Sequence, residues 1–261
     1  MTYQPVVPMT GYAGWKFLSR TIEQQKETFS QSAEIKRDVD YFREKIGTVS
    51  TAEELVSDHR LLTVSLTAFG LEDDIYAKAF VQKVLEDGTL DTTDLANKLS
   101  DKRYAAFSKA FGFGNFDTPN TVMSDFADDI ISKYQDHSFE VAIGDVDNDM
   151  RLALNLSTGL EQITETASTT NGQWLGIMGN TALRSVFETA LGFPSSFAGI
   201  DIDQQLAQFK DRAERVFGTS DVSEFLNGEK QEDLIKQFLI RSELNSYSTS
   251  TTGSLVLQLF Q

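Results

Sequence analysis

The sequence predicts an all-α, multihelical fold of roughly ten or more helices, with internal duplication of a helical unit. Apolar residues recur at spacings of three and four in segments that close on glycine, as helices commonly do. A phrase is also repeated: Ser-Asp-His-Arg at 57–60 leads to Ala-Phe-Gly-Leu at 68–71, and Ser-Asp-Lys-Arg at 100–103 leads to Ala-Phe-Gly-Phe at 110–113. A looser third copy ends at 190–193.

The repeated Ser-Asp-x-Arg has two interpretations, a functional site or a helix start. Ser57 and Ser100 suit the N-cap position, and a following Asp favours the positive end of a helix. The next position is His59 in one copy and Lys102 in the other, which argues against a shared catalytic role. We therefore interpret each copy of the phrase as one helix: an N-cap, an apolar face that packs in the core, and a glycine that ends the helix.

The first half of the chain predicts helices between turn residues. One begins near residue 15, and the next, after Ser30, carries apolar residues spaced by four, three and four until Gly47 stops it. Residues 50–54 suit a capping box for a single helix that runs to Gly70. Further helices are predicted at 73–87, 94–99, 101–111 and 121–134.

The middle of the chain contains one ambiguous segment. Residues 139–143 alternate as a strand does, but no second strand lies nearby to pair with them, so we favour a mostly helical segment. The next stretch, 150–163, has the apolar spacing of a helix. The turn-rich residues 168–172 interrupt the pattern. Helices follow at 174–191, 201–217, 222–226 and 230–244.

These elements predict three parts. Residues 1–13 form a flexible N-terminal arm, residues 14–245 form the multihelical domain, and residues 246–261 form a Ser/Thr-rich tether with an apolar C-terminal tail. Within the domain, we expect duplicated units at about 50–113 and, more loosely, at about 174–245.

Composition excludes several classes of protein. Hydrophobic residues make up 40% of the chain and charged residues 24%, as in ordinary folded proteins, and the net charge is −16. So acidic a surface repels phosphate backbones and anionic lipid, which excludes nucleic acid as the expected partner. No apolar run is long enough to insert into a membrane. The N-terminus has neither the basic start nor the apolar core of a secretory signal, so none is expected.

Residue usage also argues against an enzyme. The chain has no cysteine and two histidines, His59 and His137, which leaves little room for thiolate, Fe–S or histidine-rich chemistry. The sequence contains neither a phosphate-binding Gly-Lys-Ser/Thr loop nor a Gly-x-Ser-x-Gly elbow. We predict no catalytic residue and no cofactor.

One acidic cluster keeps an enzymatic alternative open. Asp145, Asp147 and Asp149 offer the oxygen ligands that Mg²⁺ and Ca²⁺ prefer, which suggests a metal-dependent, phosphate-handling enzyme. As a calcium loop the cluster fails, because Met150 replaces the glycine at the sixth position and Leu156 the glutamate at the twelfth. We favour an acidic helix start.

Two apolar features suggest binding. The 19 phenylalanines allow a third hypothesis, a small-molecule-binding helical module, although a packed core explains them more simply. After the polar tether come four apolar residues that either pack back onto the domain, which we favour, or bind a protein partner. These candidate partner-binding residues are Leu255, Leu257, Leu259 and Phe260.

Several phrases carry a resemblance to a known family. They are Trp-Lys-Phe-Leu-Ser-Arg-Thr at 15–21, Asp-Tyr-Phe at 40–42, Thr-Ala-Glu-Glu-Leu-Val-Ser-Asp at 51–58, Leu-Thr-Ala-Phe-Gly-Leu at 66–71, and Asp-Lys-Arg-Tyr at 101–104 with Ala-Phe-Gly-Phe at 110–113. With them the chain resembles, over most of residues 14–245, an uncharacterised alphaproteobacterial family carried as a domain of unknown function. The resemblance implies a multihelical, internally duplicated fold and genes often placed beside flagellar genes. The family has no established catalytic residues, so none is carried over.

Residues and resemblance together favour a non-enzymatic helical protein that binds an unidentified protein partner as a structural, export or regulatory component of the flagellum. We expect it in the cytoplasm, or exported through the flagellar apparatus.

Overall fold

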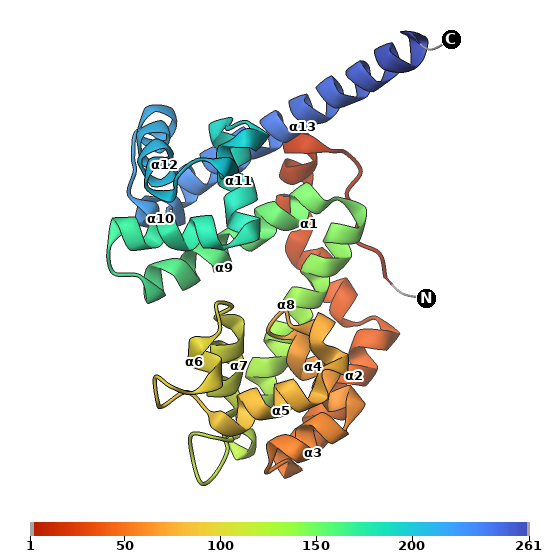
Figure 1. Cartoon of the computed structure of the whole chain (residues 1–261). Helices are drawn as coiled ribbons and strands as arrows, with labels where there is room; N and C mark the ends of the chain where they lie inside the picture. Colours follow the sequence, from red (N-terminus) through yellow and green to blue (C-terminus); the bar gives the residue numbers. More distant parts are fainter. Residues whose placement is uncertain (1–2, 260–261) are drawn as a thin grey trace. The chain divides into compact units, whose positions relative to one another are not determined.

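The computed structural model describes the backbone of residues 3–259 and the side chains of residues 3–246. Every regular element in this range is a helix: 13 are α-helices, five are short 3-10 helices, and no strand occurs (Figure 1). The predicted all-α class is therefore confirmed, and residues 139–143 are helical. No helix of the described residues is long and apolar enough to cross a membrane. The chain divides into two compact units, residues 1–5 with 22–142 and residues 6–21 with 143–261.

The first unit is built from the second part of α1 and the helices up to α8. Its elements are α1 (Gly11–Ser30), α2 (Ala33–Lys45), η1 (Ile46–Thr48), α3 (Ala52–Ser57), α4 (His59–Thr67), η2 (Glu72–Tyr76), α5 (Lys78–Asp87), α6 (Leu95–Lys98), α7 (Arg103–Phe111), η3 (Asn120–Val122) and α8 (Phe126–Val146). Helix α4 packs against α2 and α3, while α5 packs against α3 and α7. Phe42, Phe107 and Phe111 are completely buried in its core.

The helix predicted from residue 50 to Gly70 is two helices, which corrects the prediction. The capping box holds: Thr51 Oγ1 accepts from the N–H of Glu54, and the Glu54 carboxylate accepts from the N–H of Thr51. At Asp58, however, the backbone is extended, with φ −87° and ψ 106°. Its carboxylate accepts from the N–H groups of Arg60 and Leu61, so a second helix starts there.

The N-cap of α4 is thus Asp58, and the prediction that Ser57 is the cap is wrong. Ser57 is the last residue of α3, and its hydroxyl donates to the carbonyl of Glu53 at 2.7 Å. The prediction that Ser100 is a cap is also wrong: the N-cap position of α7 is Lys102, and Asp101 Oδ1 accepts the N–H of Arg103 at 2.9 Å. An aspartate carries a formal charge that complements the helix N-terminus better than a hydroxyl does.

The stops predicted at Gly112 and Gly192 are confirmed, because each is the C-cap of its helix. Gly70, Gly112 and Gly192 all have φ between 67° and 74°, the left-handed conformation that side chains disfavour. Gly112 and Gly192 directly follow α7 and α11 (Thr181–Leu191), whereas α4 ends at Thr67, three residues before Gly70. Similar ends do not establish a common origin, and internal duplication remains a prediction.

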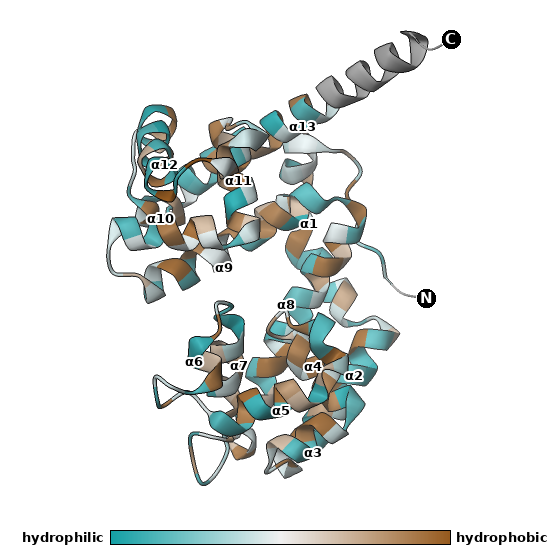
Figure 2. Cartoon of the chain, viewed as in Figure 1, coloured by the Kyte–Doolittle hydropathy of each residue, from teal (hydrophilic) through white to brown (hydrophobic). Residues whose placement is uncertain are grey.

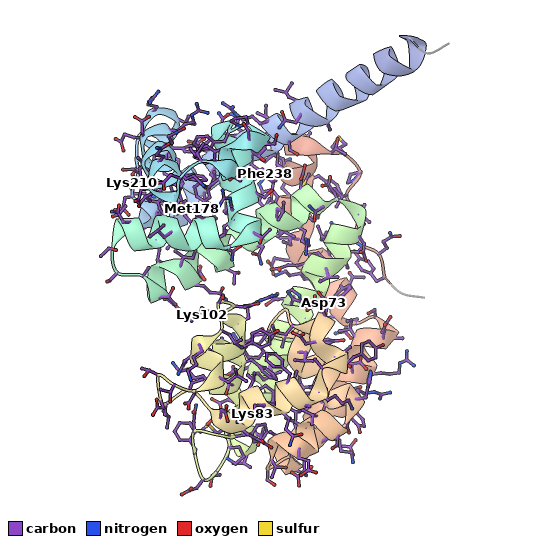
Figure 3. All side chains as sticks on the ribbon, in the orientation of Figure 1. Asp73, Lys83, Lys102, Met178, Lys210 and Phe238 are labelled. Carbon is purple, nitrogen blue, oxygen red and sulfur yellow. The ribbon has the colours of Figure 1, made fainter. Side chains whose placement is uncertain are left out.

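The second unit holds the start of α1 and the helices from α9 onward. These are α9 (Asn148–Thr166), α10 (Thr170–Gly179), α11, η4 (Ser195–Gly199), α12 (Ile202–Phe217), η5 (Val222–Leu226) and α13 (Gly228–Leu259). Helix α11 packs against α9, α10 and α13 around a core that includes Trp174 and Phe187. Met178 and Phe238, labelled in Figure 3, are buried in it. Apolar and polar residues alternate around these helices, which leaves polar faces exposed (Figure 2).

Two predicted boundaries in this unit change. The helix expected at 174–191 is interrupted at Asn180, which is extended and caps α11 by accepting the N–H of Leu183 at 3.1 Å. The backbone of α13 continues through the Ser/Thr-rich residues 246–253 to Leu259. The organisation into arm, domain and tether otherwise remains a prediction.

Candidate functional site

The three acidic residues proposed as metal ligands occupy a helix junction in the second unit. Asp145 is exposed near the end of α8. Asp147 caps α9, accepting from the N–H groups of Asp149 and Met150 at 2.9 and 3.1 Å. Asp149 accepts from the hydroxyl of Ser242 on α13. The described residues contain no group of three or more His, Cys, Asp or Glu arranged to hold a metal ion. The positions of Asp147 and Asp149 agree with a helix start and give the metal hypothesis no support.

The phenylalanines of the small-molecule hypothesis contact one another. Phe107 lies 5.4 Å from Phe69 and 5.0 Å from Phe111, measured between ring centroids, and Phe111 lies 5.1 Å from Phe126. The Phe111–Phe126 contact is edge-to-face, the arrangement of packed aromatic cores. These rings therefore act as core.

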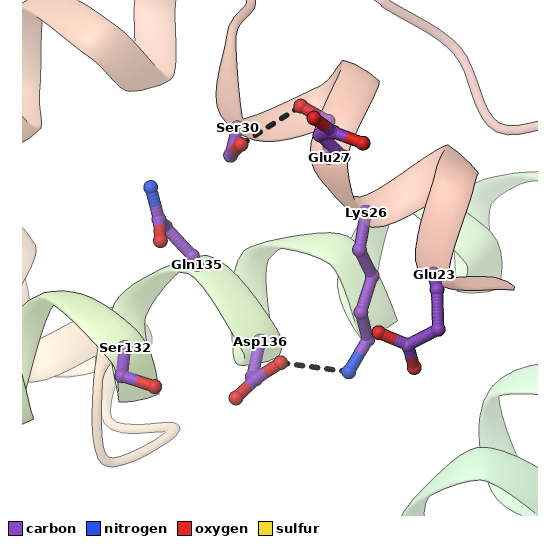
Figure 4. A pocket seen from close by; sticks show the side chains of 7 residues that line it. All are labelled: Glu23, Lys26, Glu27, Ser30, Ser132, Gln135 and Asp136. Atoms are coloured by element: carbon purple, nitrogen blue, oxygen red, sulfur yellow. Dashed lines mark hydrogen bonds and ion pairs between the residues drawn. The ribbon is translucent and has the colours of Figure 1, made fainter.

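A polar cavity of the first unit lies between α1 and α8 (Figure 4). Glu23, Lys26 and Glu27 line it from α1, and Asp136 lines it from α8. The ammonium of Lys26 donates to Asp136 at 2.7 Å, so two of the charged groups neutralise each other. The cavity is open to solvent and offers no buried polar side chain to a ligand, so it carries no site.

His137 on α8 is the one histidine placed between carboxylates. Its Nε2 lies 3.1 Å from Oε1 of Glu72, and its Nδ1 lies 3.8 Å from Oε2 of Glu140. Burial raises the pKa of Glu72, but hydrogen bonds from His137 and the backbone outweigh this and leave the pKa below its usual range. Both ring nitrogens face acids and neither faces a hydroxyl, so the geometry does not provide a nucleophile with its base.

The arginines of the two repeated phrases have different roles. Arg103 donates to the carbonyl of Gly70, where α4 has just ended, and to Asp101 at 2.6 Å. Arg60 lies over the ring of Tyr41 at 4.8 Å and pairs with a carboxylate on α2. A shared catalytic site would require a shared arrangement, so the structure supports the interpretation of the phrase as a helix start. His59 in the same phrase is exposed, as its alternation with Lys102 indicates.

The connection between α7 and α8, residues 112–125, is hereafter called the α7–α8 loop. It exposes three apolar side chains, Phe116, Val122 and Met123, each by 54–56%. A Cβ on Gly112 would lie 3.0 Å from Cδ2 of Phe116 and 3.0 Å from Nδ2 of Asn120. Phe116 and Asn120 therefore both fold back toward Gly112, and the loop is compact.

Sequence reasoning missed this loop as a candidate. The available signal was the combination of apolar residues with glycine, proline and asparagine in a stretch without a basic residue. The sequence predicts a connection only up to Pro119 and a helix from residue 121, whereas α8 begins at Phe126. Exposed apolar residues in such a stretch are not distinguishable from core residues until their burial is known.

The candidate partner-binding residues lie at the end of α13. The backbone of Leu255, Leu257 and Leu259 belongs to this helix, while Phe260 lies outside the described residues. Before them, α13 buries Leu239 but exposes Ile240 by 37% and Leu244 by 62%.

Comparison with known proteins agrees with the helical fold and leaves the role open. The sequence model of a family described as a protein of unknown function, DUF1217, matches residues 68–231. The crystal structure of a protein from Agrobacterium tumefaciens is similar, with a TM-score of 0.73 and 28% sequence identity. The similarity covers 93% of this chain and 99% of that chain. No protein of curated function matches the chain.

Proposed function

Because the chain belongs to DUF1217, a family of proteins of unknown function, we propose that it is a non-enzymatic helical protein that acts by binding a protein partner. Its context is the flagellum, as a structural, export or regulatory component, in the cytoplasm or exported through the flagellar apparatus. The flagellar part rests on the resemblance described above, in which related genes often lie beside flagellar genes.

The exposed apolar face of α13 is the observation that carries the binding role. Leu234, Ile235 and Phe238 are buried, so one side of α13 is already used by its own unit. Ile240 and Leu244 lie four residues apart on the helix and remain exposed. Beyond the Ser/Thr-rich residues 246–253, apolar residues recur in the sequence of the same helix at Leu255, Leu257 and Leu259. Amphipathic helices commonly bind partners through such residues.

The test is affinity capture from motile cells, followed by identification and binding measurements with the purified partner. The full chain is compared with a chain lacking residues 255–261 and with the double variant Ile240→Ser/Leu244→Ser. Leu175→Ser, at an exposed leucine of α10, is the matched control. We expect the first two changes to weaken binding and the control to leave it unchanged. Equal binding by all four proteins contradicts a role for α13.

The flagellar context has its own test. Deletion of the gene is expected to change flagellar number, assembly or motility. A deletion strain with normal flagella and normal swimming contradicts this part of the proposal, whatever the partner is.

A further inference from the structure

We infer that the α7–α8 loop is a second, preformed docking surface, and that it fits a protein segment carrying both apolar and basic residues. This inference goes beyond the role of α13 and does not depend on the flagellar context. It follows from three observations: the loop is fixed by its own side chains, it exposes apolar groups, and it carries charge of one sign.

Three side-chain contacts fix the loop to its unit. Asn115 accepts the N–H of Thr89 at 2.7 Å and donates to its hydroxyl at 3.0 Å. Asn120 donates to the carbonyl of Ala110 at 2.9 Å. Thr121 is buried, and its hydroxyl donates to the carbonyl of Val49 at 2.6 Å. A loop held at three points presents its exposed side chains in a defined arrangement, which lowers the entropy lost on binding.

The exposed apolar groups are large for such a fixed loop. Phe116 exposes 54%, Val122 54% and Met123 56% of their surfaces. The same loop buries two neighbouring residues, Pro119 and Thr121. The loop therefore has a buried side, and the three apolar side chains lie outside it. Aromatic and methionine side chains are enriched at protein interfaces, and methionine adapts to partners of different shape.

The negative charge near these apolar side chains indicates which kind of partner would bind. Between Lys109 and Lys133 the chain carries four aspartates and no basic residue. Asp128 pairs with Arg43 at 2.8 Å. The ion pairs of the described residues use none of the others, which are Asp117, Asp125 and Asp129, and all three are exposed.

Exposed apolar side chains that are close in sequence to exposed, unpaired aspartates are complementary to an apolar segment flanked by lysine or arginine. The same charge disfavours an anionic membrane or a nucleic acid at this surface. The partner is therefore a basic, amphipathic protein segment.

Purified full-length protein and a synthetic amphipathic helix made only of leucine and lysine test the inference. Binding is measured by fluorescence anisotropy at low salt, and a photoactivatable group on the peptide reports where it lies. We expect saturable binding, cross-links to residues 112–125, and weaker binding at higher salt. A leucine–glutamate helix of the same length is expected not to bind. Cross-links elsewhere overturn the inference.

Two pairs of variants distinguish binding at the α7–α8 loop from nonspecific attraction to the net negative charge of the protein. Phe116→Ser/Met123→Ser is expected to weaken peptide binding about tenfold. Its control, Leu175→Ser/Ile202→Ser, removes two similarly exposed apolar residues of the other unit and is expected to bind as the unchanged protein does.

The second pair consists of two triple variants that remove the same number of negative charges. Asp117→Asn/Asp125→Asn/Asp129→Asn and Glu165→Gln/Glu214→Gln/Glu224→Gln change the net charge equally, at exposed sites in different units. The first is expected to weaken binding about tenfold and the second by less than about threefold. Equal effects of the two triple variants, or no effect of Phe116→Ser/Met123→Ser, overturn the inference. Circular dichroism confirms that each variant is folded.

Discussion

The hydroxyl of Tyr41 on α2 donates to Oδ2 of Asp58 at 2.6 Å, while the other carboxylate oxygen of Asp58 caps α4. Asp58 is thus both the residue that follows α3 and the N-cap of α4. Burial raises the pKa of Asp58, but the hydrogen bonds from Tyr41 and the two backbone N–H groups outweigh it and lower the pKa overall. The hydrogen bond between Tyr41 and Asp58 explains why the chain turns at Asp58 and not at Ser57.

The two adjacent residues provide a direct test. Asp58→Ala removes the acceptor of two backbone N–H groups and of Tyr41, so it is expected to lower the free energy of unfolding by about 1–2 kcal/mol. Ser57→Ala loses a hydroxyl that bonds only within α3, and a change below about 0.5 kcal/mol is expected. Urea denaturation of both variants measures the difference. A larger loss for Ser57→Ala would restore the serine as the cap.

Within the second unit, Glu232 on α13 binds side chains at the start of α1 and makes stability depend on pH. Its carboxylate accepts from Tyr12 at 2.8 Å, from Trp15 at 3.1 Å and from Lys16. Burial raises the pKa of Glu232, and the hydrogen bonds from Lys16, Tyr12 and Trp15 outweigh it, so the pKa lies below its usual range. A carboxylate whose pKa is lowered by folding stabilises the protein above its unfolded-state pKa, about 4.3, and loses this contribution as the pH falls.

Glu232→Gln is therefore expected to lower the free energy of unfolding by about 1 kcal/mol at pH 7, with the difference from the unchanged protein shrinking from about pH 4 downward. Asp233→Asn, at the exposed neighbouring position, is the control. Chemical denaturation across the pH range measures both. A difference that is constant from pH 7 to about pH 2 would contradict the role of the charge.

Trp174 on α10 is the largest completely buried side chain of the second unit. Its ring contacts Phe187 and Phe209, and its N–H donates to the carbonyl of Ser220 at 2.8 Å. Trp174→Ala leaves a cavity and an unpaired carbonyl, so a loss of about 3–5 kcal/mol is expected. Leu175→Ala, at the exposed next residue, is expected to cost less than about 1 kcal/mol. Similar melting temperatures for the two variants would show that this core is not tightly packed.

Gly112 ends α7 with φ 74° and allows Phe116 and Asn120 to approach. Gly112→Ala forces a side chain into the left-handed conformation and against both neighbours. We expect a loss of about 1–2 kcal/mol. At Gly199 a Cβ meets nothing within 4 Å and φ is not in the left-handed region, so Gly199→Ala is the control, with a change below about 0.5 kcal/mol. Denaturation curves that rank the two variants in the opposite order would contradict the assignment.

Local patterns predicted most of the helices. The apolar stripe of α2 placed Ile35, Val39 and Phe42 in the core, where they are buried. The capping box at Thr51 and the stop at Gly112 were also predictable, because each depends on a few neighbouring residues. The acidic cluster at 145–149 was predictable as a helix start for the same reason.

The breaks at Asp58 and Asn180 were not predictable from periodicity. Apolar residues continue across both positions with helical spacing, so the pattern alone favours one long helix. At Asp58 the outcome also depends on Tyr41, which is distant in sequence and supplies a hydrogen bond to the turn.

The sequence by itself determined the all-α class, the faces of the helices and the residues on which they stop, because helix formation depends on side chains three and four positions apart. Only the tertiary structure decided which apolar residues stay at the surface. Phe111 and Phe116 have the same side chain, yet the first is buried and the second is 54% exposed. The difference arises because Asn115, Asn120 and Thr121 bind groups on distant segments and on α7, and so fix the side of the loop that faces solvent.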